Sequence, residues 1–294
     1  MKILITGSNG LLGQKLVEFC LAQQVPFLAT SLGANRNLMC PVKNYQTLDI
    51  TDEKNLFLVL KRFAPTHIIH TAAVTNVDDC EINAAQCDLV NRQSVQLLAK
   101  FCAQNSCHLQ LLSTDFVFDG QAGPYKETDQ PNPLSVYARS KQLAEQILQS
   151  EHNLKYSIVR TILVYGFAEN LSRSNLILWA KTALQSKEPI QIVDDQFRAP
   201  TWASDLAWAC LRICQLNEEG IFHICGPETL SIFQIVQRIA DFYQLEMAHV
   251  SKVSSAMLQQ AAPRPPRTGF VLDKAQKVLG YKPHTLEQTL NLLL

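Results

Sequence analysis

A tyrosine and a lysine one helical turn apart are the first residues in this sequence whose types and spacing suit catalysis. Tyr137 and Lys141 lie at i and i+4 of a predicted helix over Val136–Gln149, so their side chains share one face. A phenol has a pKa near 10, and a cation about 4 Å away stabilises the phenolate by about 4 kcal/mol, which lowers that pKa by up to about three units. The pair therefore suits general acid–base chemistry at a carbonyl or a carbinol. Taken alone, the same spacing also describes a solvated helix face.

A hydroxyl-rich segment follows a predicted strand over Leu109–Ser113. Ser113, Thr114 and Asp115 stand where that strand ends, about two dozen residues before Tyr137. Ligands of open α/β sheets bind beyond the carboxyl ends of the strands. A hydroxyl at this edge is expected to hydrogen-bond the same carbonyl oxygen that Tyr137 protonates.

A glycine-rich loop joins the first predicted strand, Ile3–Thr6, to the first predicted helix, Leu11–Gln23. Gly7, Gly10 and Gly13 have the spacing G-x-x-G-x-x-G. The glycines permit a tight turn, close approach of a pyrophosphate and close packing of helix on strand. The expected site for a nicotinamide dinucleotide is this loop and helix N-terminus, made by Gly7, Asn9, Gly10, Leu11, Leu12 and Gly13.

The end of the second predicted strand, Phe27–Thr30, indicates which dinucleotide is preferred. An acidic residue usually meets the ribose 2′-hydroxyl of NAD there. This sequence has Ser31, Leu32 and Gly33 instead, with Arg36 shortly after. Ser31 and Arg36 are candidates to meet a 2′-phosphate, so NADP(H) is favoured and NAD(H) is the alternative. Arg36 as a merely solvated loop charge remains the competing interpretation.

The elements that must position these residues alternate strand and helix. Further strands are expected at His67–His70 and Tyr156–Arg160, and helices at Asn55–Phe63 and Ala84–Asn105. This rhythm predicts an α/β fold, a Rossmann doubly wound parallel sheet with helices on both faces. We expect residues 1–165 to form the dinucleotide-binding domain, with 200–225 returning to it. A smaller interleaved C-terminal substrate lobe takes 166–294, mostly 166–199 and 226–294.

Within the second half the pattern is looser. We expect helices at Leu176–Gln185, at Ala203–Gln215 with a cap at Ser204 or Asp205, and at Ile232–Tyr243 with Ser231 as its cap. Three prolines within four positions make 261–268 a non-helical segment that carries two arginines.

Composition limits the class of protein. The 294 residues carry 26 basic and 26 acidic side chains, so no overall charge attracts nucleic acid or an anionic membrane. Nine cysteines without a paired framework suggest a reducing compartment, and no signal peptide or membrane span is recognisable. We therefore expect a cytoplasmic protein. His67 and His70 are interpreted as core or loop histidines, and no metal site is expected.

Together these residues resemble a known superfamily along nearly the whole chain. The glycine loop, Asp49-Ile50, Ala72-Ala73, Ser113-Thr114-Asp115 and the Tyr137–Lys141 pair resemble the extended short-chain dehydrogenase/reductases. Within that superfamily the chain is most similar to the dTDP-4-dehydrorhamnose reductase family. The segments that carry this resemblance are Thr71–Asp78, Ser113–Gly120 and Val193–Thr201.

The resemblance implies a reaction and a set of roles. NAD(P)H would reduce the C4 keto group of a nucleotide-linked 4-keto-6-deoxy sugar, with Thr114, Tyr137 and Lys141 as catalytic residues. Asp49 and Ile50 would flank the adenine, and Ala72, Ala73, Thr75, Tyr137 and Lys141 would contact the cofactor. The residues implied to contact substrate are Thr75, Val77, Asp115, Phe116, Arg198, Arg264 and Arg267, the last two at the substrate diphosphate. A homodimer is compatible with this assignment.

The sequence departs from the family pattern at three places. Phe116 stands where the family has tyrosine, Leu163 replaces an aromatic residue, and the segment Arg264–Phe270 lacks the usual form. These changes affect which sugar and which nucleotide are bound, and the reaction type is unchanged.

Two other functions remain open. A 4,6-dehydratase or an epimerase has the same fold, although Phe116 occupies the place of the dehydratase base. A non-catalytic subunit that binds a dinucleotide is the other alternative, because the chain also resembles the regulatory β subunit of methionine adenosyltransferase.

Overall fold

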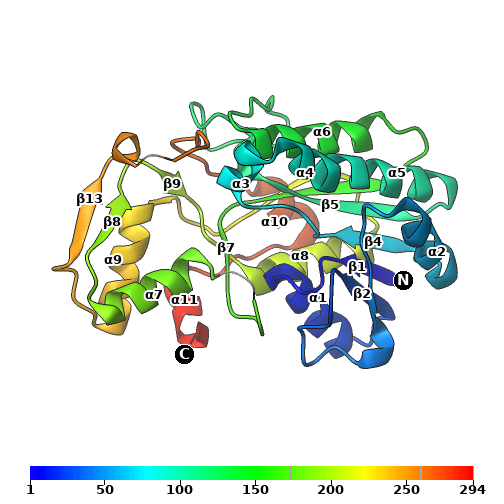
Figure 1. Ribbon diagram of the computed structural model, residues 1–294, viewed down its shortest axis with the longest axis horizontal. Coiled ribbons are helices and arrows are strands. Elements are labelled where there is room, and N and C mark those ends of the chain that lie inside the picture. The colour runs from blue at the N-terminus through cyan, green and yellow to red at the C-terminus, as the bar shows by residue number, and fades with distance from the viewer. Residues whose placement is uncertain (172–173, 259, 294) are drawn as a thin grey trace.

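A seven-stranded parallel sheet organises the computed structural model, which describes residues 1–171, 174–258 and 260–293 (Figure 1). The strand order is β11-β6-β5-β4-β1-β2-β3, so the sheet reverses direction of growth at β1. This arrangement confirms the predicted Rossmann-type α/β fold and gives a crevice at the strand ends beside β1. The strands are β1 (Ile3–Thr6), β2 (Phe27–Ser31), β3 (Tyr45–Thr47), β4 (His67–His70), β5 (His108–Thr114), β6 (Tyr156–Thr161) and β11 (Gly220–Ile224).

Helices cover both faces of this sheet, as Figure 1 shows. One face packs against α1 (Leu11–Ala22), α8 (Ala203–Leu216) and α10 (Asp273–Leu279) through a core that includes Leu16, Leu206 and Phe222. The other face packs against helices α2 (Glu53–Phe63), α5 (Ser94–Gln104) and α6 (Val136–Ser150). Each fully buried leucine or isoleucine contributes about 1.5–3 kcal/mol, so the two cores hold the strand ends in fixed positions.

A smaller group of elements lies beyond the sheet, at the left of Figure 1. Its core packs α7 (Leu176–Ser186), α9 (Ile232–Tyr243) and α11 (Leu286–Leu290) around Ile192, Trp202 and Ile239. Three two-stranded sheets complete it: β7 (Val164–Tyr165) with β10 (Thr201–Trp202), β8 (Ile190–Val193) with β13 (Val250–Val253), and β9 (Phe197–Arg198) with β12 (Leu230–Ser231).

The chain passes between the two groups more than once. Strand β11 pairs in parallel with β6, so residues 220–224 lie in the main sheet. Ala275, Leu279 and Tyr281 also pack in the same core as Leu16, although the sequence places 226–294 mostly in the substrate lobe. The reason is that α10 has an apolar side that packs against β11 and α8.

Two local predictions differ from the structure. The helix expected over 84–105 divides into α4 (Ala84–Asp88), a π-helical turn η2 (Leu89–Gln93) and α5, preceded by the short α3 (Val77–Ile82). The expected cap of α8 at Ser204 or Asp205 is wrong, because α8 begins at Ala203 and both residues lie inside it. The Asp205 carboxylate instead accepts hydrogen bonds from the backbone N–H and ring Nδ1 of His284.

Ser231 does cap α9, and the Gln234 side-chain oxygen accepts from the Ser231 backbone N–H, which completes a capping box. No helix within the described residues is both long and apolar enough to cross a membrane.

Candidate active site

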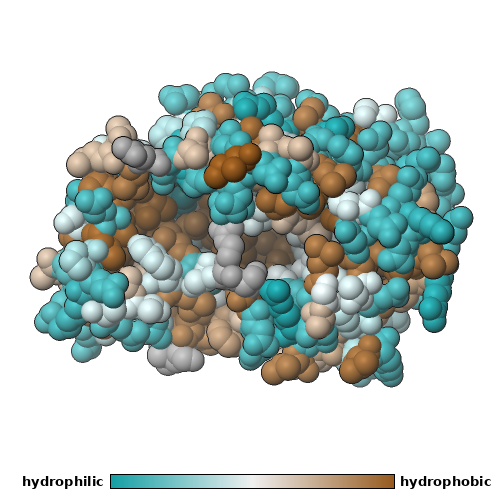
Figure 2. All heavy atoms as spheres, viewed as in Figure 1, coloured by the Kyte–Doolittle hydropathy of each residue, from teal (hydrophilic) through white to brown (hydrophobic). Residues whose placement is uncertain are grey.

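A cavity of about 1010 Å³ opens at the carboxyl ends of the sheet strands. It reaches from the glycine loop past β4 and β5 to α7, and Figure 2 shows this face of the molecule hollowed near its centre, with hydrophobic side chains in the hollow. Its size suits a dinucleotide together with a second ligand. The predicted site residues that line it are Gly7, Asn9, Gly10, Leu11, Leu12, Gly13, Ser31, Arg36, Asp49, Ile50, Ala72, Ala73, Thr75, Val77, Thr114, Asp115, Phe116, Tyr137, Lys141 and Arg198.

The glycine loop has the geometry of a phosphate cradle. Gly7 has a φ of +68°, and a Cβ built on Gly13 would lie 2.5 Å from the Gly7 carbonyl oxygen. Neither position accepts a side chain without movement of the backbone. Gly10 precedes α1 and makes no side-chain cap to it within the described residues, so the first N–H groups of α1 remain free to bind an anion.

Asn9 holds the loop that follows β2. Its amide donates to the Ala34 carbonyl at 2.9 Å, and its side-chain oxygen accepts from the Arg36 backbone N–H at 2.9 Å. Tyr45 supports the same loop by donating to the Gly33 carbonyl at 2.7 Å. These bonds place the exposed Arg36 side chain at the rim of the cavity, beside Ser31. The arrangement fits a dinucleotide with a 2′-phosphate.

Tyr137 and Lys141 are brought into the cavity by the first turns of α6. Ser135 caps this helix by accepting from the Ala138 N–H, and the Glu81 carboxylate accepts from the Val136 N–H at 2.7 Å. The Tyr137 ring contacts the edge of Phe116 at 6.2 Å between centroids. The side chain at position 116 therefore forms part of the wall next to the phenol.

The electrostatics of the pair differ from the sequence expectation. Burial raises the pKa of Tyr137, with the Thr114 hydroxyl opposing this rise, so the predicted lowering by Lys141 does not prevail. Burial lowers the pKa of Lys141 to about 8, while the nearby Glu145 carboxylate raises it. Near neutral pH the phenol is therefore a proton donor and the lysine a cation.

Thr114 and Asp115 lie at the end of β5 and in the turn η3 (Asp115–Val117). The Thr114 hydroxyl accepts from the Phe116 N–H at 3.2 Å and donates to Asp115 Oδ1 at 3.1 Å. The other Asp115 oxygen accepts from the Thr268 hydroxyl and lies 3.9 Å from Arg198 Nε. Burial raises the pKa of Asp115.

Arg198 lines the cavity, but its guanidinium N–H groups donate hydrogen bonds within the protein. Its guanidinium donates to the carbonyls of Phe197 and Pro265 at 2.7 and 2.8 Å. It also lies 5.3 Å from the centre of the Phe116 ring. Arg198 therefore ties β9 to the proline-rich segment at the side of the cavity.

Arg264 and Arg267, which the resemblance implies at the substrate diphosphate, each have a partner within the protein. Neither lines this cavity. Arg264 Nη2 makes an ion pair with Asp78 Oδ2 at 2.7 Å, which lowers the pKa of that carboxyl. Arg267 lies over the ring of Phe197, 4.8 Å from its centre. An intramolecular acidic partner thus takes the charge of Arg264 that the sequence interpretation assigned to a diphosphate.

Several lining residues escape the sequence reasoning because no motif marks them. They come from α4, from η2, from the end of β6 and from the start of α7, and include Gln86, Val90, Thr161, Asn175 and Leu176. Leu163, a departure from the family pattern, also lines the cavity and has a φ of +41°.

His67 and His70 are both buried in the sheet. His70 Nδ1 bonds the Thr6 hydroxyl at 2.8 Å, and burial lowers the pKa of His70 to about 3. His67 bonds Thr66 and Asn217. Each ring therefore packs as a neutral core side chain.

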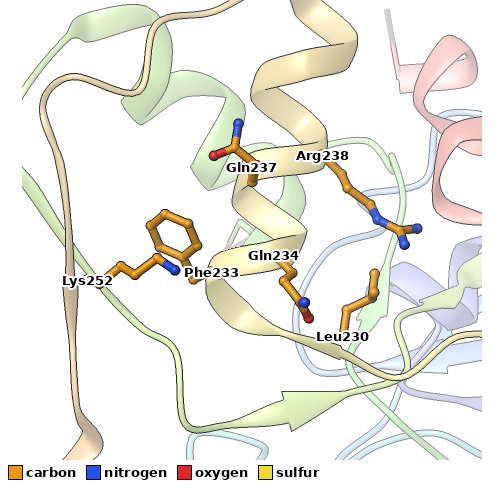
Figure 3. A pocket seen from close by; sticks show the side chains of 6 residues that line it. All are labelled: Leu230, Phe233, Gln234, Gln237, Arg238 and Lys252. Carbon is orange, nitrogen blue, oxygen red and sulfur yellow. The ribbon is translucent and has the colours of Figure 1, made fainter.

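A second, smaller pocket of about 270 Å³ lies beside α9 (Figure 3). Its cations are already engaged: Arg238 pairs with Glu228 at 2.8 Å, and the Lys252 ammonium lies 4.2 Å from the centre of the Phe233 ring. This pocket has neither the glycine loop nor the Tyr137–Lys141 pair, so the large cavity is the candidate active site.

Comparison with known proteins places the chain in a family. All 294 residues match the family described as the RmlD substrate binding domain. A dTDP-4-dehydrorhamnose reductase of Aggregatibacter actinomycetemcomitans is 28% identical, with 98% of this chain and 97% of that protein covered. A dTDP-4-keto-6-deoxy-D-glucose reductase of Streptomyces niveus is 33% identical, with 75% and 71% covered. The methionine adenosyltransferase 2 subunit beta of Xenopus laevis is 27% identical, with 94% and 82% covered.

Solved structures agree with this placement. A dTDP-4-dehydrorhamnose reductase of Clostridium acetobutylicum superposes with a TM-score of 0.87 at 26% identity, covering 100% of this chain and 98% of that one. The corresponding reductase of Bacillus anthracis, solved in complex with NADP, gives a TM-score of 0.82 at 27% identity, covering 100% and 99%. The chain belongs to the RmlD substrate binding domain family, which confirms the resemblance to dTDP-4-dehydrorhamnose reductases.

Proposed function

We propose that this protein uses NAD(P)H, with NADPH preferred, to reduce the C4 keto group of a nucleotide-linked 4-keto-6-deoxy sugar. The observation that carries the proposal is the convergence of the glycine loop, Thr114, Tyr137 and Lys141 on one cavity. Relatives named as reductases of such sugars support the substrate class, and the related structure with NADP supports the cofactor.

The dinucleotide supplies a hydride when bound. Tyr137 protonates the oxygen of the reduced carbonyl, and its raised pKa keeps the proton on the phenol until that step. The Thr114 hydroxyl, now donating to Asp115, turns toward the same oxygen and orients it. The Lys141 ammonium would hold the nicotinamide ribose, and Phe116 and Leu163 form apolar parts of the cavity wall.

The other assignments belong to the same proposal. Asp49 and Ile50 hold the adenine, and Ser31 and Arg36 meet the 2′-phosphate. Thr75 and Val77 border the sugar. We further propose a cytoplasmic enzyme, supported by its nine free, buried cysteines, and the domain division predicted from the sequence with α10 added to the dinucleotide-binding part.

The test is a turnover assay on the purified protein with dTDP-4-keto-6-deoxy sugars, using NADPH and NADH in parallel. Consumption of reduced nicotinamide and a product reduced at C4 support the proposal. Sugar conversion without net consumption of nicotinamide would indicate an epimerase instead.

The similarity to the methionine adenosyltransferase 2 subunit beta favours a second candidate, a dinucleotide-binding partner subunit. It predicts NADPH binding without turnover on any keto sugar, and recovery of a stoichiometric protein partner in a pulldown. That combination of results would exclude the reductase proposal.

A further inference from the structure

A third side chain continues the catalytic face of α6. Tyr137, Lys141 and Glu145 follow one another at intervals of four residues, so they lie along one side of the helix. The Glu145 side chain is 2% exposed, although it carries a carboxylate. A carboxylate buried this deeply needs a hydrogen-bonding or charged partner. Because it lies one helical turn from Lys141, its negative charge also favours the protonated lysine.

The partners of Glu145 come from two neighbouring strands. Arg160 on β6 donates from Nη2 to one carboxylate oxygen at 2.6 Å and from Nε to the other at 3.0 Å. The Ser113 hydroxyl at the end of β5 donates to Glu145 Oε1 at 2.5 Å. Ser113 also lines the active-site cavity, so this network connects directly to it.

The far side of Arg160 is fixed as well. Its Nη1 lies 3.3 Å from His223 Nε2, and His223 Nδ1 lies 3.1 Å from the Tyr125 carbonyl oxygen. Burial lowers the pKa of His223 to about 3, so this ring is neutral and accepts from Arg160 while donating to Tyr125. Glu145 is therefore the anion that balances Arg160.

Few other charges surround Lys141. Glu145 raises its pKa, Cys87 on α4 acts in the same direction, and neutral His70 on β4 lies near it. The remaining titratable groups around the neighbouring Tyr137 are Cys80 on α3 and Asp115 in η3. Glu145 has the largest favourable effect on the lysine charge.

We propose that Glu145 is a positioning residue, whose carboxylate, held by Arg160 and Ser113 on the same face of α6 as Lys141, keeps that lysine protonated. In the proposed function Lys141 itself contacts the cofactor, and Glu145 acts through it. This inference rests on the proposed function for its catalytic meaning, but the charge of Lys141 is measurable without turnover.

The measurement is competitive acetylation of the lysines with trace acetic anhydride across a pH series, followed by mass spectrometry. Only the neutral amine reacts, so the midpoint reports the pKa of each lysine. In Glu145→Gln, the midpoint of Lys141 is expected to fall from about 8 by about one unit, because the carboxylate that opposes burial is lost. The exposed Lys61 on α2 is the internal reference for the extent of acetylation.

The direction of the shift separates this role from a merely structural one. Loosening of α6 would expose Lys141 to water and raise its midpoint toward the ordinary value of 10.5. The matched control is Arg160→Met, which breaks the same ion pair but keeps the carboxylate, and there the Lys141 midpoint is expected not to fall. If Glu145→Gln does not fold, the double variant Glu145→Gln/Arg160→Met replaces the whole pair by uncharged groups and carries the test.

A second measurement concerns the cofactor. NADPH affinity, followed by nucleotide fluorescence, should fall as pH rises and Lys141 loses its charge. In Glu145→Gln this fall should begin at a lower pH than in the wild type, in step with the lower Lys141 midpoint. A Lys141 midpoint that is unchanged or raised in both Glu145 variants overturns the inference. Absence of wild-type turnover on keto sugars refutes the proposed function alone, because acetylation is read on the protein without substrate.

Discussion

Four histidines are buried in the sheet, and the three with the largest pKa shifts, His70, His108 and His223, make the stability of this fold depend on pH. Burial lowers the pKa of His70 and His223 to about 3 and that of His108 to about 4, from an ordinary value of 6.5. Below pH 6.5 these histidines therefore bind protons in the unfolded chain but remain neutral in the folded chain. The unfolding free energy is therefore unaffected by these histidines above pH 6.5, and it falls as the pH is lowered toward their pKa values in the folded state.

The size of the effect follows from the shifts. Between about pH 7 and about pH 5, each histidine costs about 2 kcal/mol of unfolding free energy, and the three together about 6 kcal/mol. Carboxylates of the unfolded chain titrate mostly below about pH 5, and Lys141 is protonated in both states across this window. A typical domain has only about 5–15 kcal/mol of stability, so the expected loss is large.

The assay is urea unfolding at several pH values, followed by tryptophan fluorescence. His108→Gln keeps a polar group near the Ser157 hydroxyl, which His108 bonds at 2.9 Å, and should reduce the loss by about a third. His152→Gln changes an exposed histidine and should leave the loss as in the wild type. Equal unfolding free energies at pH 7 and pH 5 would refute the reasoning.

Three further predictions concern the cavity. Tyr137→Phe should lower turnover by about 10²- to 10⁴-fold with NADPH affinity retained, and normal turnover would show that another group donates the proton. Gly13→Ala would place a Cβ 2.5 Å from the Gly7 carbonyl oxygen and 2.6 Å from Ser8 Cα. NADPH affinity, measured by fluorescence titration, should therefore fall by about tenfold or more. An unchanged affinity would contradict the phosphate-cradle assignment. Arg36→Ala should weaken NADPH by about tenfold and leave NADH unaffected, and an equal loss for both nucleotides would remove Arg36 from the 2′-phosphate site.

Much of the framework could be predicted from sequence because it depends on local patterns. Gly7, Gly10 and Gly13 mark a strand-to-helix turn by spacing alone, and the i, i+4 relation of Tyr137 and Lys141 survives any packing that leaves α6 a helix. Apolar periodicity likewise placed β1, β2, β4, β5 and β6 and most helices within one or two residues, whereas β3 was not predicted. The strands β9 and β12 had no comparable signal, because each has only two residues and pairs with a distant partner.

The charges of the site depended on what the fold brings together. Sequence spacing predicted that Lys141 lowers the pKa of Tyr137, but burial of the phenol prevails and raises it. The sequence interpretation also assigned Arg264 to a ligand. In the structure its guanidinium forms an ion pair with Asp78, which is distant along the chain. Contacts of this kind join residues well over a hundred positions apart, and no local pattern encodes them.

The sequence by itself therefore determined the glycine loop and the alternation of strands and helices, since these follow from short-range spacing and hydrophobic period. Its resemblance to known reductases indicated the family. Only the tertiary structure decided which charges remain available. It gathered Ser113, Glu145 and Arg160 behind Lys141 from a helix and two strands, and it buried them where an unpaired charge is costly. The desolvation that sets the pKa of each group is a property of the packed interior.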